Sequence, residues 1–504
     1  MTSHSQIIAK NTIFLYIRTI VIMLISLYTS RVLLDKLGVD NFGIYNLVGG
    51  VVLLFASLKG VFAQSVQRFL NYEKGKGDHD KVNDIFNISL FVHLVLGIIF
   101  VTIVILFGVW YIPKYLVLPP GTMDTAMFVF YCSVFSTLIS IATIPYDSVI
   151  IANEKFNFYA VISMVEGVLK LGIVYLLGIV GSDMLRAYAL LITGVTISIR
   201  VIYIVYALQF RECSFKRIWN KKIFVDLATF SGWNFLGNVT FSLTNEGINF
   251  VLNSFGGVVA NASRGIAYQV KSAVLQLSGN IIVASRPYIS EIVASKGKEI
   301  IFGYIIKVSR VVFLIIALTS LPIVVYAEQI LNFWLVEIPE YSVIFVQLVM
   351  VHIVIRSPQA AIDLLFSAYG EMKHYQIVQS FSLFLSLPLS FILLKIGFPL
   401  YWAFISMCVA EAITLIGILI CAKKKIGFLL TNYIKHFCVM AVLASASFSM
   451  IGILFRSFVV PSSIVSLLIC ILTIVVLGAL IAYFFFLNKE EKELVKLFID
   501  RIKK

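Results

Sequence analysis

Charged side chains stand inside long apolar stretches of this sequence, and five of the basic ones are candidates for binding: Arg18, Lys59, Arg264, Lys271 and Arg356. A charge at the centre of a bilayer costs about 2.5–3.5 kcal/mol on insertion scales, so such residues face a protein interior or a water-filled cavity. Several cations gathered in one sheltered cavity would attract an anion, because a low dielectric strengthens the attraction. The five residues are therefore candidate anion-binding groups.

The positions of these charges relative to two short turns predict their depth. Arg18 and Lys59 lie almost equally far from the centre of a brief polar stretch at residues 31–46. In a helical hairpin this spacing would place both cations at one depth, on the cytoplasmic half of the membrane. Glu246 and Arg264 flank a second turn in the same way, and the spacing predicts an ion pair between them near the outer mouth.

Two further relationships follow from helix periodicity. Lys271 comes seven residues after Arg264, so both side chains lie on one helix face. Arg356 and Asp363 have the same spacing, and Ser357–Pro358 between them predicts a kink. This last pair is either a structural clamp or part of the cavity wall, and the sequence leaves both interpretations open.

Other charges have simpler explanations. Glu166 and Lys170 are four residues apart and can neutralise each other on one helix. Arg200 lies near the end of an apolar stretch, where a long side chain can reach the membrane interface. Arg310 stands at the start of another apolar stretch, where it suits anchoring of the helix end as well as lining of the cavity.

Motifs for covalent chemistry are absent. The sequence has no GxxxxGK[ST] phosphate loop, no nucleophile motif, no metal-ligand spacing among its six histidines, and no CxxC pair among its six cysteines. We therefore expect a transporter without cofactor or metal rather than an enzyme. A membrane-embedded glycan polymerase or ligase is the alternative, but it would need a larger outer loop than the longest one predicted, residues 111–124.

The composition predicts that membrane-spanning helices position these charges. With 60% hydrophobic and 13% charged residues and a mean hydropathy of +0.97, the chain lies far from soluble proteins. Unbroken apolar runs of about 20 residues span a bilayer as helices. We predict an all-α integral membrane protein with fourteen spans, at residues 11–35, 42–68, 85–111, 125–151, 156–180, 187–210, 224–252, 258–285, 303–327, 341–368, 375–396, 399–422, 434–457 and 462–487.

Lysine and arginine placement predicts the orientation. The loops on one side of the predicted spans, and the tail at residues 488–504, carry most of the basic residues, and such loops face the cytoplasm. Both termini are therefore expected in the cytoplasm. The net charge of +14 is explained by these loops beside anionic lipid headgroups, and no nucleic-acid partner is expected.

The two halves of the sequence repeat. Leu37–Gly38 falls on Phe255–Gly256, 218 residues later, and Asp147 falls on Asp363 at nearly the same offset. Six spans separate the copies, so the repeat is parallel, as in two-lobed transporters. Each copy has a hairpin turn, supplied in the first by Gly38, Asp40, Asn41 and Gly43. The predicted organisation is an N-terminal six-span lobe, a C-terminal six-span lobe, two extra spans and a cytoplasmic amphipathic tail, at residues 1–210, 211–425, 426–487 and 488–504.

The N-terminal stretch carries a resemblance to a known family. Residues 11–52, "NTIFLYIRTIVIMLISLYTSRVLLDKLGVDNFGIYNLVGGVV", include the turn pattern LG-x-x-x-[FY]-G-x-[FY] at residues 37–45. This stretch resembles the O-antigen flippases of the Wzx type, in the polysaccharide-exporter branch of the multidrug/oligosaccharidyl-lipid/polysaccharide (MOP) superfamily. The resemblance implies a multi-pass protein of the bacterial inner membrane that turns undecaprenyl-diphosphate-linked oligosaccharides to the outer leaflet. Polysaccharide polymerases and glycosyltransferases are the protein partners that it suggests.

The resemblance also implies roles for single residues. Related peptidoglycan-precursor flippases bind diphosphate through arginines of the first, second and eighth spans, and Arg18, Lys59 and Arg264 occupy comparable places. A lysine in the second span cannot form the two-pronged contact of an arginine. Glu246 and Asp363 would couple transport to H⁺ or Na⁺, and the membrane potential is another source of energy. An ion-coupled multidrug antiporter of the same superfamily is the alternative function, although a cavity for cationic drugs should carry acids rather than cations.

Overall fold

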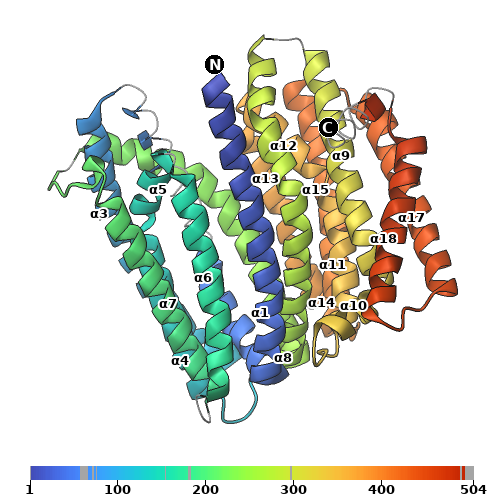
Figure 1. The fold of residues 1–504 in the computed structure, drawn as a ribbon, viewed down its shortest axis with the longest axis horizontal. Coiled ribbons are helices and arrows are strands. Elements are labelled where there is room, and N and C mark those ends of the chain that lie inside the picture. The colour runs from blue at the N-terminus through green and yellow to red at the C-terminus, as the bar shows by residue number, and fades with distance from the viewer. Residues whose placement is uncertain are drawn as a thin grey trace. The chain divides into compact units, whose positions relative to one another are not determined.

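The apolar runs fold into helices throughout the part of the chain that the structure describes (Figure 1). This structure is a computed structural model, and it describes residues 2–56, 66–67, 69–70, 73–74, 77–153, 155–179, 183–218, 220–295, 298–488 and 491–493. Its α-helices are α1 (Thr2–Ala56), α3 (His79–Tyr115), α4 (Met123–Ala142), α5 (Ile144–Ala152), α6 (Phe156–Leu176), α7 (Met184–Ala207), α8 (Lys221–Ser295), α9 (Lys298–Val325), α10 (Ala327–Trp334), α11 (Ser342–Arg356), α12 (Gln359–Tyr369), α13 (Met372–Phe384), α14 (Ser386–Lys395), α15 (Trp402–Ile426), α16 (Leu430–Tyr433), α17 (Val439–Phe458) and α18 (Ile464–Ile481). Short 3₁₀ or π segments are η1 (Leu177–Ile179), η2 (Arg211–Cys213), η3 (Ile434–Cys438) and η4 (Ala482–Phe486).

Ten helical segments among the described residues are long and apolar enough to cross a membrane. They coincide with ten of the predicted spans, from the span at residues 85–111 to the one at 462–487. The other four predicted spans fall on α1 and α8, each of which contains a kink at a glycine. Most of the second half of the span predicted at residues 42–68, after Ala56, lies outside the described residues. The protein is thus an all-α, multi-pass membrane protein.

The two kinks correct the predicted turn residues. In α1 only Gly38 has non-helical dihedral angles, with φ 73°, so Asp40, Asn41 and Gly43 belong to the following helical arm rather than to the turn. In α8 the kink is at Gly257, with φ 60°, and not at Gly256. A positive φ strains residues that carry a Cβ atom, which explains why glycine occupies both kinks.

Prolines interrupt one span in each half of the chain. The span predicted at residues 125–151 is built from α4 and α5, which meet at Thr143 just before Pro145. The kink predicted at Ser357–Pro358 is confirmed, because α11 ends at Arg356 and α12 begins at Gln359. In both places an aspartate follows the break within one or two turns.

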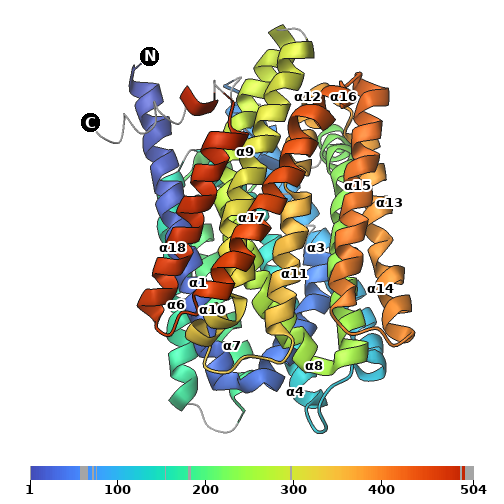
Figure 2. The same ribbon diagram turned by 90° about the vertical axis from the view of Figure 1, so that its right-hand side faces the viewer.

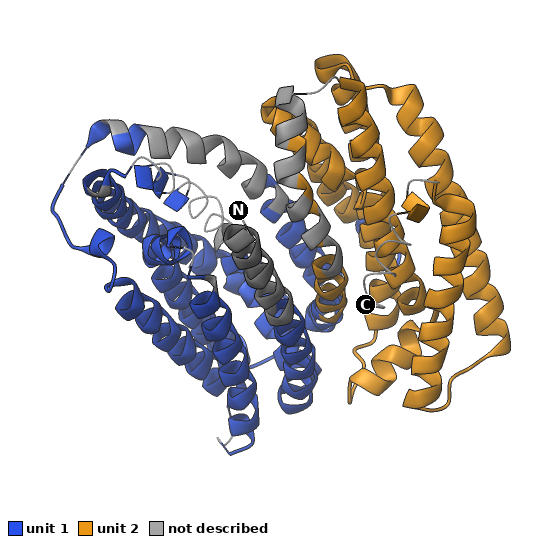
Figure 3. Ribbon diagram, turned by 45° about the horizontal axis from the view of Figure 1, so that its top comes forward, with its two compact units in different colours: residues 1–265, 394–400 blue, residues 266–393, 401–504 orange. Residues whose placement is uncertain are grey.

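The chain forms two compact units (Figure 3). Unit 1 comprises residues 1–265 and 394–400, and unit 2 comprises residues 266–393 and 401–504, so α8 contributes to both. The boundary predicted between lobes, at residues 210 and 211, stays a prediction. Within unit 1, α4 packs on α3 and α7, and α6 packs on α1.

Within unit 2, α9 is the central helix. It packs against α11, α12, α17 and α18 (Figure 2), and 61% of its most apolar stretch is buried, far more than for most other candidate spans. Arg310 of α9 fixes the C-terminal helices, because its guanidinium donates two hydrogen bonds to the Glu491 carboxylate, at 3.0 and 3.1 Å. It also donates to the carbonyl oxygens of His436 and Phe486 in the two π segments. Arg310 therefore anchors the C-terminal helices to α9, and the structure does not give it the role of lining a cavity.

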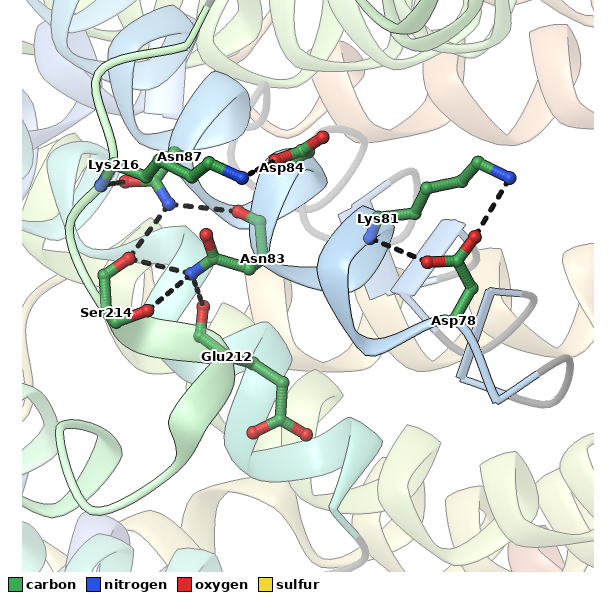
Figure 4. Close-up of polar contacts among 8 residues, drawn as sticks. All are labelled: Asp78, Lys81, Asn83, Asp84, Asn87, Glu212, Ser214 and Lys216. Atoms are coloured by element: carbon green, nitrogen blue, oxygen red, sulfur yellow. Dashed lines mark hydrogen bonds and ion pairs between the residues drawn. The ribbon is translucent and has the colours of Figure 1, made fainter.

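Two buried asparagines of α3 hold the segment that follows α7 (Figure 4). Asn83 donates from Nδ2 to the carbonyl oxygen of Ser214 at 2.7 Å, and Asn87 donates to the same oxygen at 3.0 Å. The amide of Lys216 donates in return to Oδ1 of Asn87 at 2.9 Å. These bonds satisfy backbone groups outside the helices and fix the path of the chain between α7 and α8.

Candidate functional site

The predicted site residues fall into three groups. The side chain of Arg18 and the whole of Lys59 lie outside the described residues, so their roles stay predictions. Glu246 and Arg264 belong to unit 1. Lys271, Arg356 and Asp363 belong to unit 2, which we describe after the first pair.

The predicted ion pair between Glu246 and Arg264 is present. Nη2 of Arg264 lies 3.7 Å from Oε1 of Glu246, and both side chains are buried. The same nitrogen donates to the carbonyl oxygen of Asn245 at 2.8 Å, and Nδ2 of Asn245 donates to Oε1 of Glu246 at 2.8 Å. Arg264 is thus held by an acid across the α8 kink.

A row of buried asparagines continues from this ion pair toward the kink. Asn261 donates from Nδ2 to the side-chain and main-chain oxygens of Asn249, both at 2.8 Å. Asn253 donates to Oδ1 of Asn261 at 3.1 Å and also binds both backbone groups of Val117, accepting from its amide at 2.8 Å and donating to its carbonyl at 3.0 Å. The two arms of α8 are therefore tied together, and to the segment after α3, by paired amides.

Close approach of α1 to this part of α8 depends on small residues. A Cβ atom on Gly43 would lie 2.1 Å from the carbonyl oxygen of Val258, and one on Gly50 would lie 2.7 Å from the side chains of Glu246 and Asn249. Nδ2 of Asn249 also donates to the carbonyl oxygen at position 46. Gly43, the second glycine of the LG-x-x-x-[FY]-G pattern, thus allows the two helices to pack closely.

In unit 2 a cluster of charges surrounds Glu411, which lies in the middle of α15 and is fully buried. Nε2 of His352, on α11, lies 3.2 Å from Oε2 of Glu411. Nε of Arg356, one turn further along α11, lies 3.9 Å from Oε1. The cluster joins α11 to α15, which pack against each other.

Further groups complete this cluster. Lys271 is buried, and its ammonium group lies 4.5 Å from the ring centre of Tyr268, one turn earlier on α8. The charge of Lys271 acts on both His352 and Glu411. Gln359 at the start of α12 donates from Nε2 to the backbone carbonyl oxygen of Glu411 at 3.3 Å.

Arg356 has an acidic partner that helical spacing did not predict. Its guanidinium forms an ion pair with Glu411, while the predicted relation with Asp363 stays a prediction. Asp363 still belongs to the surroundings, since Arg356, Asp363 and Glu411 all act electrostatically on the buried phenol of Tyr375. Two cations therefore share two carboxylates inside unit 2.

Sequence reasoning missed Glu411 and His352. Glu411 is the lone acid of the apolar run at residues 401–421, and this was the signal that could have identified it. His352 was set aside because the histidines show no ligand spacing. Its proximity to Glu411 depends on the packing of α11 against α15, which no sequence motif encodes.

Two other membrane charges also have partners. Nη1 of Arg200 lies 2.8 Å from Oδ2 of Asp147, so Arg200 forms an ion pair instead of reaching toward the interface, and its guanidinium lies over the Tyr203 ring. The predicted pair of Glu166 and Lys170 is confirmed, at 2.6 Å. Among the residues that the structure describes, no group of three or more histidine, cysteine or acidic side chains has the arrangement of a metal site.

Comparison with known sequences now identifies the family. The sequence pattern of the polysaccharide biosynthesis protein family matches residues 8–293, more than half of the chain. The chain belongs to this family. The match covers almost all of α1, where the turn pattern lies, and almost all of α8. No curated protein matches the sequence.

Solved structures share the fold of this family member at low sequence identity. An inward-facing multidrug resistance MATE family transporter of the MOP superfamily aligns with a TM-score of 0.69 and 14% identity, over 83% of this chain and 99% of the other. The lipid II flippase MurJ in an inward closed conformation aligns with a TM-score of 0.66 and 11% identity, over 94% and 99%. A MOP superfamily transporter from Pyrococcus furiosus, described by the reverse polarity of its binding pocket, gives 0.60 and 13%, over 84% and 96%. The chain therefore has the MOP superfamily fold.

Proposed function

We propose that this protein is a flippase that carries undecaprenyl-diphosphate-linked oligosaccharide repeat units from the cytoplasmic to the extracytoplasmic leaflet by alternating access. It would act in the bacterial inner membrane with both termini in the cytoplasm. Three findings support this proposal. The family is one of polysaccharide biosynthesis, MurJ shares the fold, and unit 2 holds basic residues inside the membrane region.

The observation that carries the proposal is the placement of Lys271 and Arg356 around Glu411. A diphosphate that links a lipid to a sugar is a compact dianion, and its transfer across hydrocarbon needs cations in a sheltered place. Arg356 supplies a planar fork that suits phosphate oxygens, while Lys271 supplies a point charge. Arg18, Lys59 and Arg264 are the other cations that we propose for contact with the diphosphate.

The test measures lipid-linked intermediates in cells whose own flippase gene is replaced by variants of this one. Replacing Lys271 or Arg356 with Gln should reduce surface polysaccharide and raise the amount of precursor on the cytoplasmic side. Arg18→Gln, Lys59→Gln and Arg264→Gln test the remaining cations in the same assay. Lys170→Gln is the matched control, because Glu166 already neutralises that lysine.

The same experiment distinguishes the proposed flippase from the alternative function, a multidrug antiporter. Normal surface polysaccharide in every variant, at normal membrane abundance, would contradict the proposed role of the cations. If those variants also changed susceptibility to cationic drugs, the ion-coupled multidrug antiporter would be the better interpretation. Candidate protein partners, the polymerases and glycosyltransferases of the same pathway, would be sought by crosslinking in the same cells.

A further inference from the structure

His352 and Glu411 place an imidazole beside a carboxylate in the interior of unit 2, and the proposed function does not use this pair. Nε2 and Oε2 lie 3.2 Å apart, and both side chains are shielded from solvent. His352 is the one side chain of the described part of the chain that offers a hydrogen bond to the Glu411 carboxylate. Burial of a carboxylate with so few hydrogen-bond donors is unfavourable, and one added proton relieves it.

We propose that His352 and Glu411 form a proton-binding pair that controls how strongly Arg356 and Lys271 attract an anion. The inference rests on the proposed function, because the anion is the diphosphate of the lipid-linked substrate. Histidine is the side chain whose ordinary pKa lies nearest to neutral pH, and an anion that binds beside the pair would favour its protonated form.

The charges that face the pair come from several helices. Lys271 on α8 and Arg356 on α11 act on the pair, and Glu411 acts in turn on the weaker acid Cys408 of α15. Asp363 on α12 acts on the phenol of Tyr375 on α13, as Arg356 and Glu411 do. On α9, which also packs against α11, Arg310 is held by Glu491, and Lys307 lies one turn before it. Lys271 and Arg356 balance Asp363 and Glu411, so the cluster is neutral without a proton on the pair and carries one positive charge with it.

The proton changes what Arg356 can do. In the unprotonated pair, the carboxylate of Glu411 attracts the guanidinium of Arg356 at 3.9 Å. When Glu411 receives the proton, or accepts a hydrogen bond from a protonated His352, this attraction weakens. Arg356 has 29% of its side chain exposed, against 0% for Glu411, and is therefore the member of the pair that can turn toward a bound anion.

Proton binding and anion binding then strengthen each other, because coupling between two sites is reciprocal. Uptake of one proton with each anion would change the dissociation constant by up to about tenfold for each pH unit. The affinity for a diphosphate lipid should increase as the pH falls through the range in which the pair titrates.

The test uses the full-length protein in lipid nanodiscs and farnesyl-diphospho-N-acetylglucosamine as the probe. The diphosphate diester of this probe does not titrate near neutral pH, so a pH effect reports on the protein. Calorimetry between about pH 5 and pH 8 gives the affinity across the range in which histidine titrates. Repeating each titration in buffers with different ionisation enthalpies counts the protons taken up.

We expect the wild-type protein to bind more tightly as the pH falls and to take up protons on binding. Glu411→Gln, which mimics the protonated acid, should bind tightly at every pH without proton uptake, and His352→Gln should show a weaker pH dependence. His374→Gln is the matched control. Nδ1 of His374 also lies close to a carboxylate, 2.7 Å from Oε2 of Glu371, but that pair is partly exposed, and this variant should behave like the wild type.

Two results separate the inference from the proposed function. Wild-type binding that is independent of pH, or an unchanged pH dependence in both Glu411→Gln and His352→Gln, would overturn the inference while the flippase proposal stands. Failure of the folded wild-type protein to bind the probe at any pH would overturn both. Proton uptake by the wild type needs no variant, so the test remains decisive if Glu411→Gln does not fold.

Discussion

Replacement of Gly43 by alanine should destabilise the protein, although alanine is normally the better helix residue. Gly43 lies in the second arm of α1, where the sequence pattern first suggested a turn. A Cβ atom at this position would be 2.1 Å from the carbonyl oxygen of Val258 and 2.8 Å from its carbonyl carbon. Both atoms belong to the backbone of α8, so no side-chain rotation can remove the clash.

The size of the effect follows from a comparison with Gly49, in the same helix. A Cβ atom there meets no atom within 4 Å. The two substitutions share the gain in helix propensity, about 1 kcal/mol. At Gly43 the new contact is 1.3 Å shorter than the 3.4 Å at which ordinary contacts begin. Overpacking of this kind costs about 1–3 kcal/mol, so Gly43→Ala should be less stable than Gly49→Ala by that amount.

The assay is unfolding of the two purified variants and the wild type in mixed micelles of increasing SDS content, followed by circular dichroism. Gly49→Ala should unfold at or above the SDS fraction of the wild type, and Gly43→Ala below it. Equal midpoints for the two alanine variants would refute the reasoning, because the close approach of α1 and α8 would then not require a glycine at position 43.

The remaining predictions concern buried partners. Arg310→Gln leaves the Glu491 carboxylate buried without its cation, so it should cost about 3–5 kcal/mol and speed proteolysis at the C-terminal tail; unchanged cleavage would contradict the anchoring role. Asp147→Asn and Arg200→Gln should each destabilise the protein, while the double variant should lose less than the two losses together, and additive losses would contradict a direct interaction. Burial, followed by the charge of the neighbouring carboxylate, raises the pKa of the Cys213 thiol to about 12. Because only the thiolate reacts, maleimide labelling of the folded protein should stay slow from pH 7 to pH 9 and should become fast in SDS; rapid labelling at pH 7 would contradict this burial.

Much of the fold could be predicted because it depends on local rules. A continuous apolar run has only one way to satisfy its backbone in lipid, so the spans follow from composition. The kink after Arg356 follows from Pro358 in the same way. The pair of Glu166 and Lys170 is equally local, because it needs no more than helical spacing.

The limits of prediction appear where a partner comes from another helix. The repeat offset placed the second kink at Gly256, one residue before Gly257, because several residue types match near a turn but only a dihedral angle identifies it. Arg200 has no acid within reach on its own helix, and its partner Asp147 is 53 residues away. Spacing along the sequence cannot reveal such a pair.

Sorting the membrane cations by their partners is therefore the step that the structure adds. Arg200 and Arg310 each have a close carboxylate at 3.0 Å or less. Such cations are already compensated and contribute chiefly to stability. Around Glu411, by contrast, the nearest guanidinium nitrogen is 3.9 Å away, and the charge of Lys271 reaches the same acid. The Arg356 side chain is 29% exposed, so an anion that reached it would compete with Glu411 for the guanidinium. Under the proposed function, each acid beside a membrane cation is therefore a competitor of the diphosphate for that cation.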